Sequence, residues 1–131
     1  MAKQRKTSAK DFHNIQFFQD QKNARSIEDI FPTVKLITIN LKTTPEAPWM
    51  GEAKKNREVY RAHEKAFFRI RCRYECIAGG IDLGQIVGSL VSNRTMEISG
   101  VEYCRGWRDE DRMNVSHCFL QHDYTVVVEY Y

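Results

Sequence analysis

The sequence predicts a single α+β domain built on an antiparallel or mixed β-sheet, with one or two helices packed on one face. Residues 67–77 and the last part of 115–131 alternate in polarity with the two-residue period of a strand. Residues 82–91 repeat apolar side chains with the period of an amphipathic helix. The 131 residues are 42% hydrophobic, which is enough for one core and excludes a wholly disordered chain.

The first 25 residues are predicted to form a basic, irregular arm ahead of a domain spanning 26–131. No acidic residue accompanies the four basic residues of the first ten, Lys3, Arg5, Lys6 and Lys10. The rest of the chain, with sixteen basic and seventeen acidic residues, is close to neutral. Such an arm binds phosphates, neutralises an acidic partner or is a solvated tail, which is the commonest case for so short a run.

The first elements of the domain are a short helix and a strand. Ser26 has the side chain and position of a helix N-cap, and Pro32 stops that helix within two turns. Val34–Leu41 has the composition of a strand, and the prolines and glycine of residues 43–51 indicate a loop. Glu52–Ala66 contains strong helix formers but only a thin apolar stripe, which favours a solvated helix or a long mobile excursion.

Phe67–Ile77 shows the clearest strand pattern. Its apolar and cysteine side chains share one face, and Arg69, Arg71 and Arg73 share the other with Glu75. A Gly-Gly turn follows, and then the helical stripe Leu83, Ile86, Val87, Leu90 and Val91. Thr95–Cys104 is expected to be a strand with a bulge at Gly100, and after a charged turn Val115–Tyr131 is expected to be a long strand or a bent pair.

The four cysteines are predicted to be reduced and buried, because a chain of this length with a good core needs no disulfides. Cys72 and Cys76 are four residues apart, as are Cys118 and His122. On strands, residues four apart stand about 13 Å from each other, too far to share one zinc ion or to form a disulfide. A site that mixes one residue from each strand with Cys104 or His117 stays open, but we expect no metal and no cofactor.

No catalytic constellation is evident. The histidines are scattered, the glycines fit no phosphate-binding motif, and no known signature surrounds a cysteine. Asp109, Glu110 and Asp111 form an acidic turn, for which pairing with the flanking arginines is a simpler explanation than a cation site. We therefore expect a non-enzymatic protein without a small-molecule substrate.

The most distinctive surface feature is the arginine ladder, defined as Arg69, Arg71 and Arg73. Acidic residues of a neighbouring strand would satisfy it internally, and Asp123 and Glu129 share a face suited to this. Alternatively the ladder meets a protein partner, or it meets nucleic acid with Phe67 available for stacking.

The order of elements over residues 67–131 resembles the tail-terminator or tail-completion proteins of tailed phages. This resemblance is carried by the strand FFRIRCRYECI, the helix IDLGQIVGSLV and the final strand DYTVVVEYY. It implies a structural virion protein that forms rings with copies of itself and contacts other structural proteins through the basic arm and the arginine ladder. The alternative is an RNA-binding or ribonucleoprotein component that uses the same basic residues.

The expected location is the virion or the host cytoplasm. The basic start lacks the apolar region of a secretory signal, and no apolar run approaches the roughly 20 residues that span a bilayer.

Overall fold

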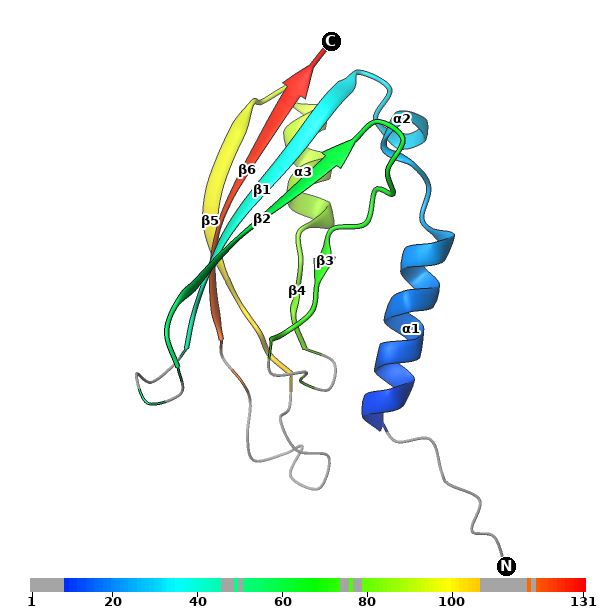
Figure 1. Cartoon of the computed structure of the whole chain (residues 1–131). Helices are drawn as coiled ribbons and strands as arrows, with labels where there is room; N and C mark the ends of the chain where they lie inside the picture. The colour runs from blue at the N-terminus through cyan, green and yellow to red at the C-terminus, as the bar shows by residue number, and fades with distance from the viewer. Residues whose placement is uncertain are drawn as a thin grey trace, which may run out of the picture.

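A four-stranded antiparallel sheet forms the body of the protein, with strand order β2-β1-β6-β5 (Figure 1). The computed structural model describes residues 9–45, 49, 51–73, 76, 79–106, 118 and 120–131, with side chains from Asn14 onward. The strands are β1 (Val34–Thr44), β2 (Lys54–Arg61), β5 (Glu97–Tyr103) and β6 (Gln121–Tyr130). Together with three helices and a second small sheet, they confirm the predicted α+β class.

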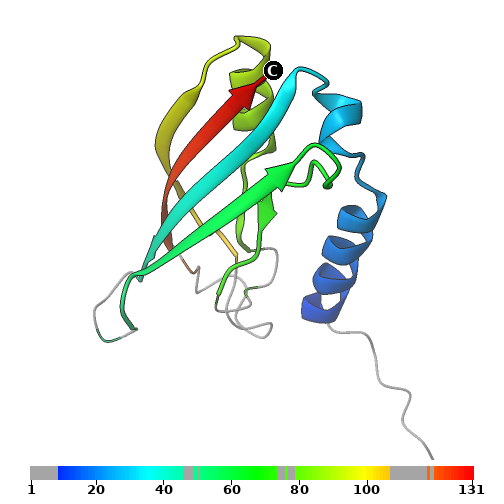
Figure 2. The same ribbon diagram turned by 45° about the horizontal axis from the view of Figure 1, so that its top comes forward.

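One face of the sheet is the core face. Helix α3 (Gly84–Ser92) lies over it in both views of the ribbon (Figures 1 and 2). The predicted stripe is confirmed, because Leu83, Val87 and Leu90 are buried against this face. The strands contribute the buried residues Ile37, Ile39, Leu41, Tyr124, Val126 and Val128. Alternate residues of β6 are buried, as expected for a strand with one covered face.

The predicted strand over residues 67–77 is wrong for most of the part that the structure describes, which is residues 67–73 and 76. In that part only β3 (Arg69–Ile70) is a strand, and it pairs with β4 (Ile81–Asp82) as a separate two-stranded sheet. Cysteine imitates a small apolar side chain in an alternating pattern, so the sequence could not distinguish a strand from a chain that turns to bring cysteines together.

The helices differ from expectation at the N-terminal end. Residues 9–23 were expected to be irregular but form the helix α1 (Ala9–Asn23). The short helix α2 (Ile27–Ile30) is confirmed, with the Ser26 Oγ accepting a 3.3 Å hydrogen bond from the Asp29 backbone N–H. Within the described residues, no helix has the length and apolar character needed to cross a membrane.

Two further predictions are wrong for tertiary reasons. Residues 54–61 are the edge strand β2 rather than a helix, because pairing with β1 from Leu36 to Thr43 outweighs their helix propensity. No bulge occurs at Gly100, which continues the regular register of β5 with β6. The glycine is needed because the Tyr124 ring covers its backbone, and a Cβ at this position would overlap the tyrosine hydroxyl.

Candidate metal centre

The side chains of all four cysteines converge at one end of the sheet. The sulfur atoms of Cys72, Cys76, Cys104 and Cys118 all lie within 4.8 Å of one another. Cys72 Sγ is 3.5 Å from Cys76 Sγ and 3.6 Å from Cys118 Sγ. These separations are far longer than the S–S bond of about 2.05 Å in a disulfide, and all four cysteines are free thiols.

The prediction that Cys72 and Cys76 are too far apart is therefore wrong. It assumed an extended chain, but β3 ends at Ile70 and the chain turns at Arg73. The turn places two residues that are four apart in sequence on the same sulfur cluster.

Two glycines let the chain return close to these sulfur atoms. A Cβ on Gly79 would lie 2.6 Å from the Cys76 Cβ and 3.0 Å from the Cys104 Sγ. Gly80 has a φ of +85°, which favours glycine, and its backbone N–H donates a 3.2 Å hydrogen bond to the Cys104 Sγ. The sequence contained this signal as two cysteines with three residues between them and a Gly-Gly pair that begins three residues after the second cysteine.

The other two cysteines come from extensions of β5 and β6. The Cys104 N–H donates to the Leu120 carbonyl, and the Cys118 N–H donates to the Gly106 carbonyl, each at 2.9 Å. This antiparallel pairing continues the β5–β6 ladder beyond Tyr103 and Gln121. One side of the cluster is therefore anchored to the main sheet, and the other side is carried by the segment between β3 and β4.

The geometry fits a tetrahedral metal ion. Four thiolates bound to zinc at about 2.3 Å stand about 3.8 Å from one another, close to the 3.5 and 3.6 Å separations found here. Cys104 and Cys118 are fully buried, and Leu120 packs beside them. The Gly80 N–H supplies the kind of hydrogen bond to sulfur that supports a bound thiolate.

The close packing also shifts the pKa values of the thiols in different directions. Contact with Cys104, and then with Cys118 and Cys72, raises the pKa of Cys76 far above its ordinary value. The pKa of Cys118 is strongly lowered by hydrogen bonds from Cys104, Cys72 and Cys76. Cys118 raises the pKa of Cys104, but Cys72, Cys76 and the Gly80 N–H lower it to a net value of about 6. The cluster thus favours partial ionisation, which a cation would complete.

His122 is not part of the sulfur cluster, although it follows Cys118 by four residues. It is 1% exposed, and neither ring nitrogen has a hydrogen-bond partner among the described residues. Burial lowers the pKa of His122, which keeps the ring neutral, while Cys118 and Asp123 act in the opposite direction. His117, the alternative ligand considered from the sequence, lies outside the described residues.

The arginine ladder does not form one strip. Arg69 forms a 2.7 Å ion pair with Asp20 of α1, and its guanidinium lies 5.3 Å from the centre of the Phe17 ring. Arg71 donates a 2.8 Å hydrogen bond to Asn14 Oδ1, also on α1. Arg73 turns away and donates to the Glu52 carbonyl at 3.0 Å. Two of the three arginines therefore hold α1, and the predicted partner acids Asp123 and Glu129 lie on β6 in the main sheet.

Several predicted residues have no described side chain. Lys3, Arg5 and Lys6 of the basic arm lie outside the described residues, as does the acidic turn Asp109–Asp111. Lys10 falls in the first turn of α1. An interface role for these basic residues stays a prediction.

Comparison of the chain with protein-family models, with curated proteins and with solved structures finds no match. The assignment of a function therefore depends on the geometry described above.

Proposed function

We propose that this protein binds one zinc ion through Cys72, Cys76, Cys104 and Cys118, and that the metal has a structural role. The supporting observation is the convergence of four sulfur atoms within 4.8 Å from three separate parts of the chain. Zinc is the favoured ion because tetrahedral four-thiolate coordination is typical of structural zinc sites.

A structural role is favoured because four protein thiolates complete the coordination sphere. Catalytic zinc usually has three protein ligands and keeps a fourth position for water or substrate. Here the ion would join the β3–β4 segment to the extended ends of β5 and β6, whose described residues share few large apolar side chains.

The test is the metal content of the purified full-length chain, prepared under reducing conditions without added chelator. We expect one zinc per chain by elemental analysis. We also expect Cys104→Ser and Cys118→Ser to lose most of it, because three ligands bind the ion much less tightly. Replacement by cobalt should give the visible absorption of a tetrahedral cobalt–thiolate site.

Val87→Ala is the matched control, since it weakens the main core without touching a sulfur atom. It should keep one zinc per chain, which separates loss of a ligand from general loss of stability. Stoichiometric iron with a coloured protein would overturn the assignment of zinc. Disulfide-bonded cysteines with no affinity for either metal would overturn the site itself.

The resemblance to phage tail-terminator proteins stays a prediction about where such a zinc-stabilised protein acts. It predicts a ring of identical subunits, and native mass spectrometry of the zinc-loaded chain would measure both the subunit number and the metal content. A strict monomer at high protein concentration would count against the assembly role and leave the zinc site untouched.

A further inference from the structure

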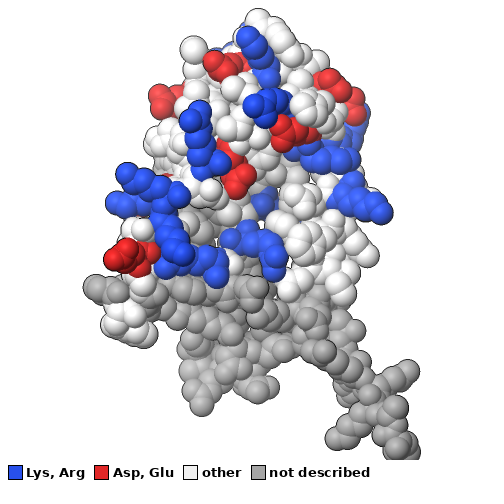
Figure 3. Space-filling model, viewed as in Figure 1, with Lys and Arg blue, Asp and Glu red and all other residues white. Residues whose placement is uncertain are grey.

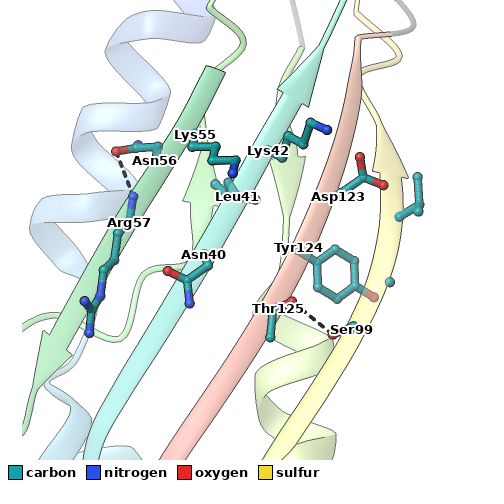
Figure 4. Close-up of a pocket in the computed structure, with 12 residues that line it drawn as sticks. Asn40, Leu41, Lys42, Lys55, Asn56, Arg57, Ser99, Asp123, Tyr124 and Thr125 are labelled. Atoms are coloured by element: carbon teal, nitrogen blue, oxygen red, sulfur yellow. Dashed lines mark hydrogen bonds between the residues drawn. The ribbon is translucent and has the colours of Figure 1, made fainter. Parts of the chain in front are cut away.

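The face of the sheet opposite α3 carries a groove of about 730 Å³, lined by all four main strands. Figure 4 shows its side chains on β2, β1, β6 and β5. Its polar lining groups include the Asn40 amide on β1 and the hydroxyls of Ser99 and Thr125, which share a 3.0 Å hydrogen bond. Asn40, Ser99 and Thr125 occupy positions that alternate with the core-face positions along their strands. The core residues Leu41 and Tyr124 also border the groove, and none of the four cysteines lines it.

Positive charge dominates the β1–β2 side of this groove. Lys42, Lys55 and Arg57 line it, with Asp123 as the acidic lining residue. Figure 3 shows Lys and Arg side chains gathered on this side of the molecule. Among the described residues, none of these three cations has an ion-pair partner. Asp123 instead accepts hydrogen bonds from Gln121 Nε2 at 3.1 and 3.2 Å.

The register places two like charges directly opposite each other. Lys42 on β1 pairs with Lys55 on β2, and the neighbouring pair is Asn40 with Arg57. Like charges at facing positions destabilise an antiparallel pair. Lys42 also faces Asp123 on β6, which offsets part of that cost, and an anion lying between β1 and β2 would offset the rest.

Two exposed aromatic side chains lie outside the groove lining, one on β5 and one in the β1–β2 connection. Tyr103 lies on the same face of β5 as Val101, which lines the groove. Tyr103 pairs with Gln121 on β6, and Val101 pairs with Asp123, two residues further along that strand. It is 44% exposed. Trp49, in the connection between β1 and β2, is 85% exposed. Cationic grooves with exposed aromatic rings are the common design of sites for single-stranded nucleic acid, because the phosphates meet the cations and the bases stack on the rings.

We propose that this groove binds single-stranded nucleic acid. The phosphates contact Lys42, Lys55 and Arg57, and a base stacks on Tyr103. This assignment differs from the one based on the sequence, in which the arginine ladder made the contacts, because Arg69 and Arg71 are engaged with α1.

The test is fluorescence anisotropy of the full, zinc-loaded chain with labelled oligo(U) and oligo(dT) of about 20 nucleotides, longer than the roughly 4–16 that one small domain covers. The double variant Lys42→Gln/Lys55→Gln removes two phosphate contacts. The slope of log affinity against log salt should fall by about 1.4, and affinity at about 0.1 M salt should fall by about 25-fold. Tyr103→Ala should weaken binding about tenfold without changing the salt slope.

The matched control is Lys22→Gln/Arg25→Gln, which removes the same charge from exposed positions at the end of α1 and just beyond it. Affinity should change less than about threefold, because charges more than about 10 Å away are screened at this salt concentration. Lys42→Gln/Lys55→Gln should retain full thermal stability, since it relieves a repulsion. Stronger binding to oligo(U) than to oligo(dT) would identify RNA as the ligand, and the reverse would identify DNA.

Equal losses in the two double variants would overturn the proposal, because binding would then follow net charge rather than the groove. Failure to bind either polymer at low salt would also overturn it. If the non-binding chain formed a multimer that Lys42→Gln/Lys55→Gln dissociates, the groove would be a protein interface instead.

Discussion

Removal of the metal is expected to open one end of the molecule and leave the main sheet folded. The two buried clusters are separate among the described residues, and Leu120 is the one large apolar side chain among the buried residues of the sulfur cluster. Burying Leu120 and the thiols contributes about 5 kcal/mol. Ordering even the six described residues between positions 71 and 80 costs roughly 6–12 kcal/mol of backbone entropy. Without zinc, the burial free energy is smaller than the entropy cost, so we expect this segment to be unfolded in the metal-free protein.

The measurement is hydrogen exchange with mass spectrometry, with and without a strong zinc chelator at constant reductant. The reporters are the backbone N–H groups of Gly80, Cys104 and Cys118, which donate to groups within or beside the cluster. Their exchange should accelerate by at least about a hundredfold, or about 2.7 kcal/mol of opening free energy. The N–H groups of Val87 and Val128, in the main core, should keep their protection. Added zinc should restore the original pattern.

Two results would refute this reasoning. Equal acceleration throughout the chain would mean that the metal holds the whole fold together and that the main core is not independently stable. No acceleration at any of the three reporters, with zinc removal confirmed by elemental analysis, would mean that the cluster segments are ordered without metal.

Other substitutions test single contacts. Gly80→Ala should cost several kcal/mol and lower zinc content, because its Cβ would overlap the Ile70 carbonyl at a φ of +85°; Gly88→Ala, whose Cβ meets nothing within 4 Å, should be neutral or stabilising by up to about 1 kcal/mol in urea unfolding. Arg69→Gln should cost about 1 kcal/mol or less, because the ion pair is more than one-third exposed, and should make α1 more sensitive to protease; unchanged proteolysis would contradict its anchoring role. Burial, followed by Glu58 and Glu64, raises the pKa of Tyr60 from 10.0 to about 12, so stability should fall as pH rises from 10.0 to about 12. Tyr60→Phe should lessen that fall in urea titrations, and an identical pH dependence would rule the tyrosine out.

The elements that could be predicted are those whose pattern depends on one sheet face. Val34–Leu41 and Gln121–Tyr130 alternate or run apolar because one face of each strand packs against the core, and α3 shows a stripe because one side of it is buried. The edge strand β2 was missed because it has little buried surface, so its composition is that of an exposed helix. Helix α1 was missed because its side chains have no strong amphipathic pattern and it is held by contacts to Phe67 and Arg69.

The metal site could not be predicted because a cysteine can act either as a small apolar side chain or as a metal ligand, and the sequence pattern does not distinguish the two. As a small apolar residue it completed the alternating pattern of residues 67–77, and as a ligand it requires the chain to turn. A turn at Arg73 reverses the distance argument entirely, and local sequence does not give the position of a turn that long-range contacts stabilise. The convergence also depends on Cys104 and Cys118 meeting across the β5–β6 ladder, which is a tertiary pairing.

The strand order β2-β1-β6-β5 has a consequence for the order of events during synthesis. β6 pairs with β1 on one side and with β5 on the other, so these strands cannot form one sheet before β6 is present. Residues 121–130 are also the last of these strands to leave the ribosome. Until then the only part of the main sheet that a nascent chain can form is the β1–β2 hairpin, with the second hydrogen-bonding edge of β1 unpaired. A stalled or truncated chain would therefore expose this edge, and we expect such fragments to depend on chaperones that bind extended segments.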